Sequence, residues 1–133
     1  MIYALDSNIV SYILRREKCV RERWLHEEGC GRQSVIPLIV YYEIRRGLLS
    51  AGASVKMAGF ERLCGILRTD PLTVRDMDMA ADIYAIRKRL GQPIEAADLL
   101  IAAQCLSHGY TLVTNNTRHF EGISGLRLDN WVK

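Results

Sequence analysis

The sequence lacks a long apolar run, since none of its stretches approaches the roughly 20 consecutive apolar residues that a membrane-spanning helix needs. Its opening residues also lack the basic and apolar segments of a secretory signal. Apolar residues make up 49% of the 133 positions and charged residues 25%, which excludes a disordered or collagen-like chain. We therefore expect a single globular domain, residues 1–133, that works in the cytoplasm.

Cysteine is scarce and follows no ligand pattern. The spacings of the four cysteines match neither a zinc site nor a Cys-x-x-Cys redox pair. Their number is compatible with two disulfides, but a reducing compartment favours their interpretation as small apolar side chains that fill space. The residues concerned are Cys19, Cys30, Cys64 and Cys105.

Common catalytic and binding motifs are also missing. Residues 29–32 are not followed by the Lys-Ser/Thr of a phosphate-binding loop, and no Gly-x-Ser-x-Gly elbow occurs. Residues 50–60 contain no aspartate that a phospho-receiver domain would need. The three histidines have no metal-ligand spacing, but sites for hard metal ions are built from carboxylates and do not require histidine.

Basic residues are present in a small excess, which gives a formal net charge of +3. The excess lies in the first half of the chain, and a second basic cluster occupies positions 87–89. Basic clusters on an otherwise neutral protein suit a polyanion such as RNA. Solvated helix faces explain any one cluster equally well.

Short apolar runs alternate with amphipathic stretches along the chain. The runs predict strands at residues 1–5, 34–36, 71–74, 111–114 and 126–131. The stretches predict a first helix that is capped by Ser7 or Asn8 and extends to about Arg16. Further helices are predicted at residues 19–28, 38–50, 53–67, 77–90 and 96–107. This alternation indicates an α/β fold with a central parallel sheet of about four to five short strands flanked by helices.

Two of the expected strands end in polar residues, at positions 6–8 and 114–116. In parallel α/β sheets, ligands bind beyond the carboxyl ends of the strands. Asp98 opens the most apolar helix and Glu43 lies within another apolar helix, so both can approach Asp6 at that edge. Carboxylates that converge in apolar surroundings repel one another, and Mg²⁺ or Mn²⁺ relieves this repulsion through oxygen ligands.

Each of these residues also has a purely structural interpretation. Asp6 or Asp98 can cap the helix that follows it. Glu43 can form an ion pair with Arg46 one turn later. Asn115 and Asn116 are common in turns. Only the joint pattern favours a metal site.

Four motifs occur in order along the chain. They are Leu-Asp-Ser-Asn at 5–8, Tyr-Glu-Ile-Arg-Arg-Gly at 42–47, Asp-Leu-Leu-Ile-Ala-Ala at 98–103 and Val-Thr-Asn-Asn-Thr-Arg-His-Phe at 113–120. In this order and spacing they resemble the motifs of PIN-domain ribonucleases. The closing segment at 125–131 is similar to that of the VapC toxins of bacterial type II toxin–antitoxin pairs, so the resemblance extends over almost the whole chain.

The resemblance implies a metal-dependent endoribonuclease in which Asp6, Glu43 and Asp98 surround Mg²⁺ or Mn²⁺. A metal-activated water would hydrolyse phosphodiester bonds in tRNA or other structured RNA. It further implies a homodimer and a VapB-like antitoxin that blocks the site. Supporting roles are expected for Ser7, Thr114 and Asn116, and contacts with the RNA backbone for Arg15, Arg16, Arg45, Arg46, Arg87, Lys88 and Arg89.

The sequence also departs from the PIN pattern. Ser7 replaces the more usual threonine and keeps the hydroxyl. Asn116 stands where many relatives have a fourth acid, and His119 where some have glutamate, which leaves a second metal position open. Two alternatives therefore remain: a non-catalytic RNA-binding or protein-interaction module with the same fold, and a nuclease of housekeeping RNA processing.

Overall fold

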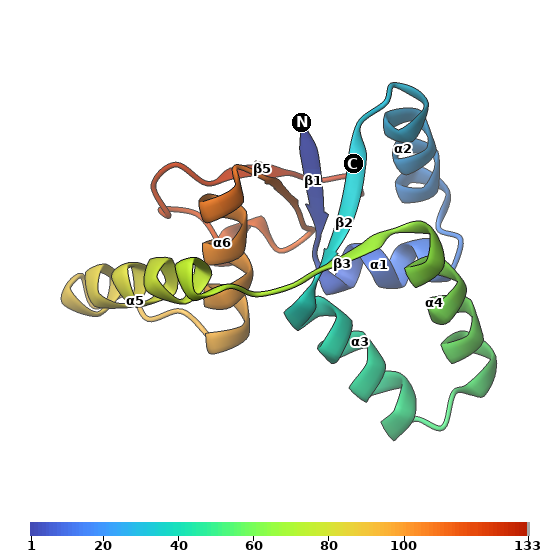
Figure 1. Ribbon diagram of the computed structural model, residues 1–133, viewed down its shortest axis with the longest axis horizontal. Helices are drawn as coiled ribbons and strands as arrows, with labels where there is room; N and C mark the ends of the chain where they lie inside the picture. The colour runs from blue at the N-terminus through green and yellow to red at the C-terminus, as the bar shows by residue number, and fades with distance from the viewer. Residues whose placement is uncertain (133) are drawn as a thin grey trace.

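The computed structural model describes residues 1–132. Its centre is a five-stranded sheet in the order β3-β2-β1-β4-β5, and every neighbouring pair is parallel (Figure 1). The predicted α/β class and its parallel sheet are therefore confirmed. The strands are β1 (Ile2–Leu5), β2 (Gln33–Pro37), β3 (Arg68–Asp70), β4 (Thr111–Val113) and β5 (Arg127–Asp129).

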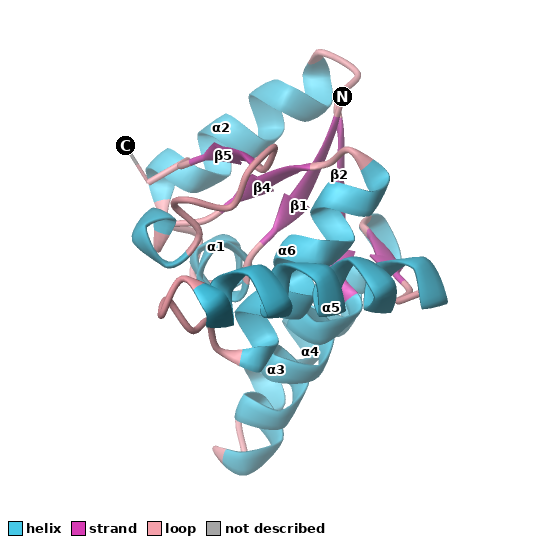
Figure 2. Ribbon diagram, turned by 90° about the vertical axis from the view of Figure 1, so that its left-hand side faces the viewer, coloured by secondary structure: helices cyan, strands magenta, loops and turns pink. Residues whose placement is uncertain are grey.

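Helices connect the strands and cover both faces of the sheet. They are α1 (Ser7–Leu14), α2 (Lys18–Gly29), α3 (Leu38–Ser50), α4 (Ser54–Ile66), α5 (Val74–Arg89) and α6 (Ala96–His108), with a short 3₁₀ turn η1 (Thr117–His119). Figures 1 and 2 show α5 and α6 on one side of the sheet and α1 and α2 on the other. The central strands are apolar on both faces because both faces are covered, and Leu5, Ile36 and Leu112 are fully buried.

The turn between α6 and β4 depends on one glycine. Gly109 follows α6 with φ 71°, a left-handed conformation that glycine adopts without strain. The chain therefore reverses directly into β4, which lies beside β1 with Val113 opposite Leu5. This pairing brings the carboxyl ends of β1 and β4 together.

One predicted strand is wrong. Residues 71–74 form no strand, because Thr73 caps α5 and exchanges hydrogen bonds with Asp76 in a capping box. The strand of this region is β3, three residues earlier, and it has the sequence Arg-Thr-Asp. An edge strand without apolar residues gives no hydrophobic signal, whereas Leu72 and Val74 gave a misleading one.

The cysteines only partly behave as predicted. All four are free, and Cys105 is fully buried, where burial raises the pKa of its thiol well above the usual range. Cys64 is half-buried, but Cys19 and Cys30 are exposed on and just after α2. The space-filling interpretation is wrong for these two, because they lie on the solvent side of a highly charged helix.

No described helix has the length and apolar character needed to cross a membrane.

Candidate active site at the carboxyl edge of the sheet

Asp6 and Thr114 directly follow the neighbouring strands β1 and β4. The backbone N–H of Asp6 donates to the carbonyl of Val113 at 2.9 Å, which extends the pairing by one residue. The Thr114 hydroxyl then donates to Asp6 Oδ2 at 2.7 Å. The convergence expected from the strand ends is therefore present in the structure.

Asp6 is only 4% exposed, and three donors hold its carboxylate. Its Oδ1 accepts the backbone N–H of Ser7 at 2.8 Å, and its Oδ2 accepts the Asn8 amide at 3.3 Å as well as the Thr114 hydroxyl. Asp6, rather than Ser7 or Asn8, is the N-cap of α1. The capping interpretation is thus correct for Asp6, and it is compatible with a site role because the cap fixes the carboxylate at the sheet edge.

The loop after β4 is tied to the same residues. The Asn116 backbone N–H donates to the Thr114 hydroxyl oxygen at 3.0 Å, and the Asn115 N–H donates to Asn8 Oδ1 at 3.0 Å. Ser7 and Asn116 thus contact Asp6 and Thr114 through their backbone N–H groups. Asn8 was not predicted, although it belongs to the same polar cluster after β1.

Glu43 and Asp98 reach this edge from α3 and from the first turn of α6. Burial, followed by the charge of Asp6, raises the pKa of each carboxyl group above its ordinary value. Asp98 and Glu95 raise the pKa of Glu43 further, while Arg46 lowers it without cancelling the effect. The carboxylates of Asp6, Glu43 and Asp98 are therefore close enough to repel one another.

Two of the structural alternatives fail. Glu95, not Asp98, occupies the N-cap position of α6, so Asp98 is not the helix cap. Among residues 1–132, Glu43 and Arg46 do not approach within the 4.0 Å of an ion pair. Asp98 instead has an unexpected partner, because its Oδ2 lies 3.1 Å from Nδ1 of His119.

The carboxylate oxygens of Asp6, Glu43 and Asp98 are the type of donor that a hard metal ion binds. Within the part of the chain that the structure describes, no three Asp, Glu, His or Cys side chains already surround one point closely enough to hold an ion. Mg²⁺ binds through one or two protein carboxylates and keeps several waters. Mutually repelling carboxylate oxygens at one sheet edge are donors of the kind that such an ion takes.

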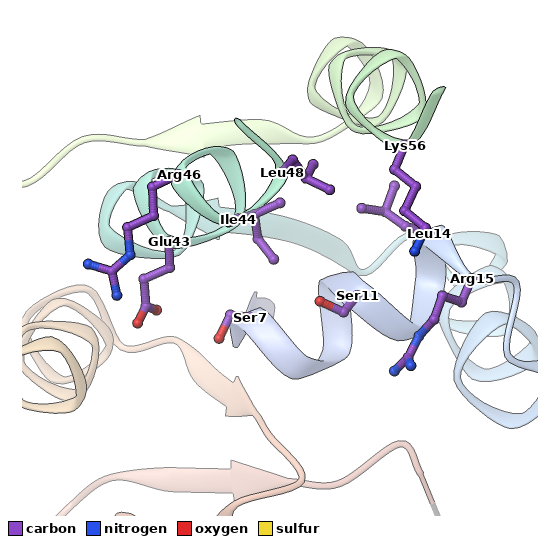
Figure 3. A pocket seen from close by; sticks show the side chains of 10 residues that line it. Ser7, Ser11, Leu14, Arg15, Glu43, Ile44, Arg46, Leu48 and Lys56 are labelled. Atoms are coloured by element: carbon purple, nitrogen blue, oxygen red, sulfur yellow. The ribbon is translucent and has the colours of Figure 1, made fainter. Parts of the chain in front are cut away.

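A pocket of about 610 Å³ opens beside the acids (Figure 3). It lies between α1, α3 and α4, and Glu43 forms part of its wall. Of the basic residues predicted to contact RNA, only Arg15 and Arg46 line it. Lys56 and Ser11 also line the pocket. They were not among the predicted site residues, because no motif in α4 or in the middle of α1 indicated a functional role.

The other predicted basic residues lie elsewhere. Arg45 points to α4, where it contacts Met57 and Glu61. Arg87 donates to the carbonyls of Gln92 and Glu121 and so fastens the end of α5. The remaining members of the set do not line the pocket, and they are Arg16, Lys88 and Arg89.

Comparison with known proteins agrees with this geometry. A family model described as the PIN domain matches residues 3–126. The chain is 32% identical to the "tRNA(fMet)-specific endonuclease VapC" of Shigella flexneri, with 97% of each chain covered. It is 30% identical to "Ribonuclease VapC2" of Haemophilus influenzae, with 98% of each covered. The chain therefore belongs to the PIN-domain family and, within it, to the VapC-type ribonuclease toxins.

Solved structures give the same result. A structure of VapBC2 from Rickettsia felis bound to a DNA fragment from their promoter is similar, with a TM-score of 0.90 and 25% identity over 98% of this chain and 99% of that chain. DNA-bound VapBC from Salmonella typhimurium matches with a TM-score of 0.88 and 27% identity over 98% of both chains.

Proposed function

We propose that this protein is a Mg²⁺- or Mn²⁺-dependent endoribonuclease that acts as a toxin in the cytoplasm, with tRNA or another structured RNA as its substrate. The convergence of Asp6, Glu43 and Asp98 at one sheet edge, with raised pKa values for two of them, carries this proposal. The tRNA assignment is supported by the name of the Shigella relative.

Different residues of the chain have different proposed roles in hydrolysis. Asp6 and Asp98 would hold the ion, which supplies a stronger nucleophile from water and neutralises charge on the phosphate oxygens when bound. Thr114 fixes the Asp6 carboxylate, and the contact with His119 orients Asp98. Glu43, with its raised pKa, can accept the proton of the attacking water. The water oxygen bonds to phosphorus as the P–O3′ bond breaks, and the departing O3′ takes a proton from solvent, which leaves a 5′-phosphate and a 3′-hydroxyl.

The proposed partners are a VapB-like antitoxin and a second copy of the chain. The antitoxin is supported by the VapBC complexes among the similar structures. Without metal the site is acidic, so we expect the antitoxin to place a basic side chain there. The homodimer is supported by exposed apolar side chains on α3 and α5, such as Leu38, Tyr42 and Tyr84, and light scattering in solution tests it.

The first test is expression of the protein alone in bacteria. A toxin should stop growth and leave cleaved RNA, and co-expression of the protein encoded beside it should restore growth. Intact RNA and normal growth would overturn the proposal in favour of a non-catalytic module. RNA cleavage without growth arrest would favour a housekeeping nuclease.

A second test concerns the ion directly. Mg²⁺ or Mn²⁺ at about 100 times its dissociation constant should stabilise the folded protein by about 2.7 kcal/mol, which raises the melting temperature by roughly 10 °C. Asp98→Asn should remove most of this shift. Asp78→Asn, an exposed aspartate on α5, should keep it. If millimolar Mn²⁺ leaves the melting temperature of the parent protein unchanged, this result would contradict a metal site in the free protein.

A further inference from the structure

Two side chains that commonly bind metals lie side by side at the end of α2. His26 is in the last turn of this helix, and Cys30 is its C-cap residue, four positions later. Residues at this spacing share one face of a helix. The Cys30 Sγ lies 3.8 Å from His26 Nε2, and both residues are exposed. A thiol and an imidazole therefore face each other at the protein surface.

This pair lies at the opposite edge of the sheet from the carboxylates. Cys30 and the short turn after it lead into Gln33, the first residue of β2, whereas Asp6 directly follows the last residue of β1. Because β1 and β2 are parallel, these two positions are at opposite edges. Figure 1 shows the end of α2 leading into the start of β2, away from α3. The pair is therefore separate from the candidate active site.

The distance between the two ligand atoms fits a single bound ion. A tetrahedral Zn²⁺ ion bonds to thiolate sulfur at about 2.3 Å and to imidazole nitrogen at about 2.0–2.1 Å, which places the two ligand atoms roughly 3.6 Å apart. The observed 3.8 Å therefore requires almost no movement of either side chain. Sulfur and imidazole nitrogen also select zinc and similar cations over Mg²⁺, which prefers oxygen ligands.

The charges around the pair favour a cation. Glu27 pairs with Arg23 at 3.0 Å and with Arg32 at 2.6 Å, so the charges of these two arginines are compensated. Glu22 and Glu28 are exposed on the same helix and form no ion pair among residues 1–132. The carboxyl end of a helix also carries a partial negative charge that stabilises a positive ion.

We propose that His26 and Cys30 bind one Zn²⁺ ion, or another soft or borderline divalent cation, at the end of α2. Within residues 1–132 no third Asp, Glu, His or Cys side chain completes the pair, so water fills the remaining positions of the ion. The thiol gives up its proton to solvent as the metal–sulfur bond forms. Because the helix creates the spacing of the two ligands, the ion binds the folded protein and stabilises the last turn of α2.

The experiment follows the reactivity of single exposed thiols. Cys19→Ser leaves Cys30 as the exposed cysteine and Cys30→Ser leaves Cys19, because Cys64 is half-buried and Cys105 is buried. Each reduced variant reacts with a thiol-specific disulfide reagent at increasing Zn²⁺ concentrations. The rate for Cys30 should fall along a binding curve, to about a tenth when Zn²⁺ is at ten times its dissociation constant, and EDTA should restore it.

Cys19 is the matched control. It is exposed on the same helix but lies seven residues before His26, which is about 10 Å along the helix axis, so Zn²⁺ should not slow its reaction. Cys19→Ser/His26→Ala should lose the protection of Cys30, because the imidazole ligand is gone. Cys19→Ser/Asp98→Asn should keep that protection, because Asp98 belongs to the other edge of the sheet.

Protection of Cys30 that depends on His26 supports the site. The proposal is overturned if submillimolar Zn²⁺ leaves the Cys30 rate unchanged, protects Cys19 equally, or still protects Cys30 after His26→Ala. Cd²⁺ gives an independent readout, because a Cd²⁺–thiolate bond adds ultraviolet absorption that Cys19→Ser should keep and Cys30→Ser should lose. No RNA is present in either measurement, so the results do not depend on the proposed ribonuclease function.

Discussion

Asp98→Asn should reduce RNA cleavage by about 10²- to 10³-fold while the protein still folds. The side chain is nearly isosteric, and Glu95 rather than Asp98 caps the helix, so no capping hydrogen bond is lost. The raised pKa of Asp98 means that its ionised form is disfavoured in the fold. Removing that charge should leave the metal-free protein unchanged or slightly more stable at neutral pH. Cleavage of total tRNA with Mn²⁺ and thermal unfolding, measured side by side, check both parts.

The controls for this experiment lie in the same chain. Asp78→Asn makes the same chemical change at an exposed position of α5 and should cleave like the parent. Asp6→Asn should lose cleavage as fully as Asp98→Asn. It should also lose some stability, because Asp6 accepts hydrogen bonds from Ser7, Asn8 and Thr114. A folded Asp98→Asn protein that cleaves at the parent's rate would overturn the site assignment.

The part of the site that the sequence predicts follows from strand order. Asp6 and Thr114 follow buried strands, and parallel strands place their carboxyl ends at one edge. The two side chains can form a hydrogen bond because β1 and β4 are neighbours in the sheet. Periodicity also placed Asp98 and Glu43 on helices, but it did not reveal how the helices are rotated about their axes.

The parts that the sequence does not predict depend on packing between distant segments. The contact between Asp98 and His119 joins α6 to the turn after β4, and no local pattern encodes it. Lys56 reaches the pocket because α4 packs beside α1 and α3. The exposed Cys19 and Cys30 show the same limit, since composition indicates that cysteine is usually buried but not which face of a helix is covered.

Asp76→Ala should cause the largest loss of stability of any single substitution considered for this chain, about 3 kcal/mol. The side chain is fully buried between the start of α5 and the end of α6. Its carboxylate accepts the Thr73 backbone N–H at 2.9 Å and the Ser107 hydroxyl, and one oxygen lies 3.1 Å from His108 Nε2. Alanine would leave these groups without their partner, and the melting temperature should fall by roughly 10 °C.

The pH dependence of this loss identifies its cause. Burial alone would raise the pKa of Asp76, but the hydrogen bonds from Ser107 and Thr73 and the nearby His108 outweigh burial and lower it. A carboxyl group with a lowered pKa stabilises the fold above its unfolded-state pKa of about 4, and that contribution disappears as the pH falls through the folded value. The parent and Asp76→Ala should therefore differ at pH 7 and converge in acid. Asp78→Ala, exposed on the same helix, should stay within about 0.5 kcal/mol of the parent. Equal losses for the two variants would show that the loss of a negative charge near the N-terminus of α5, rather than of the buried network, is responsible.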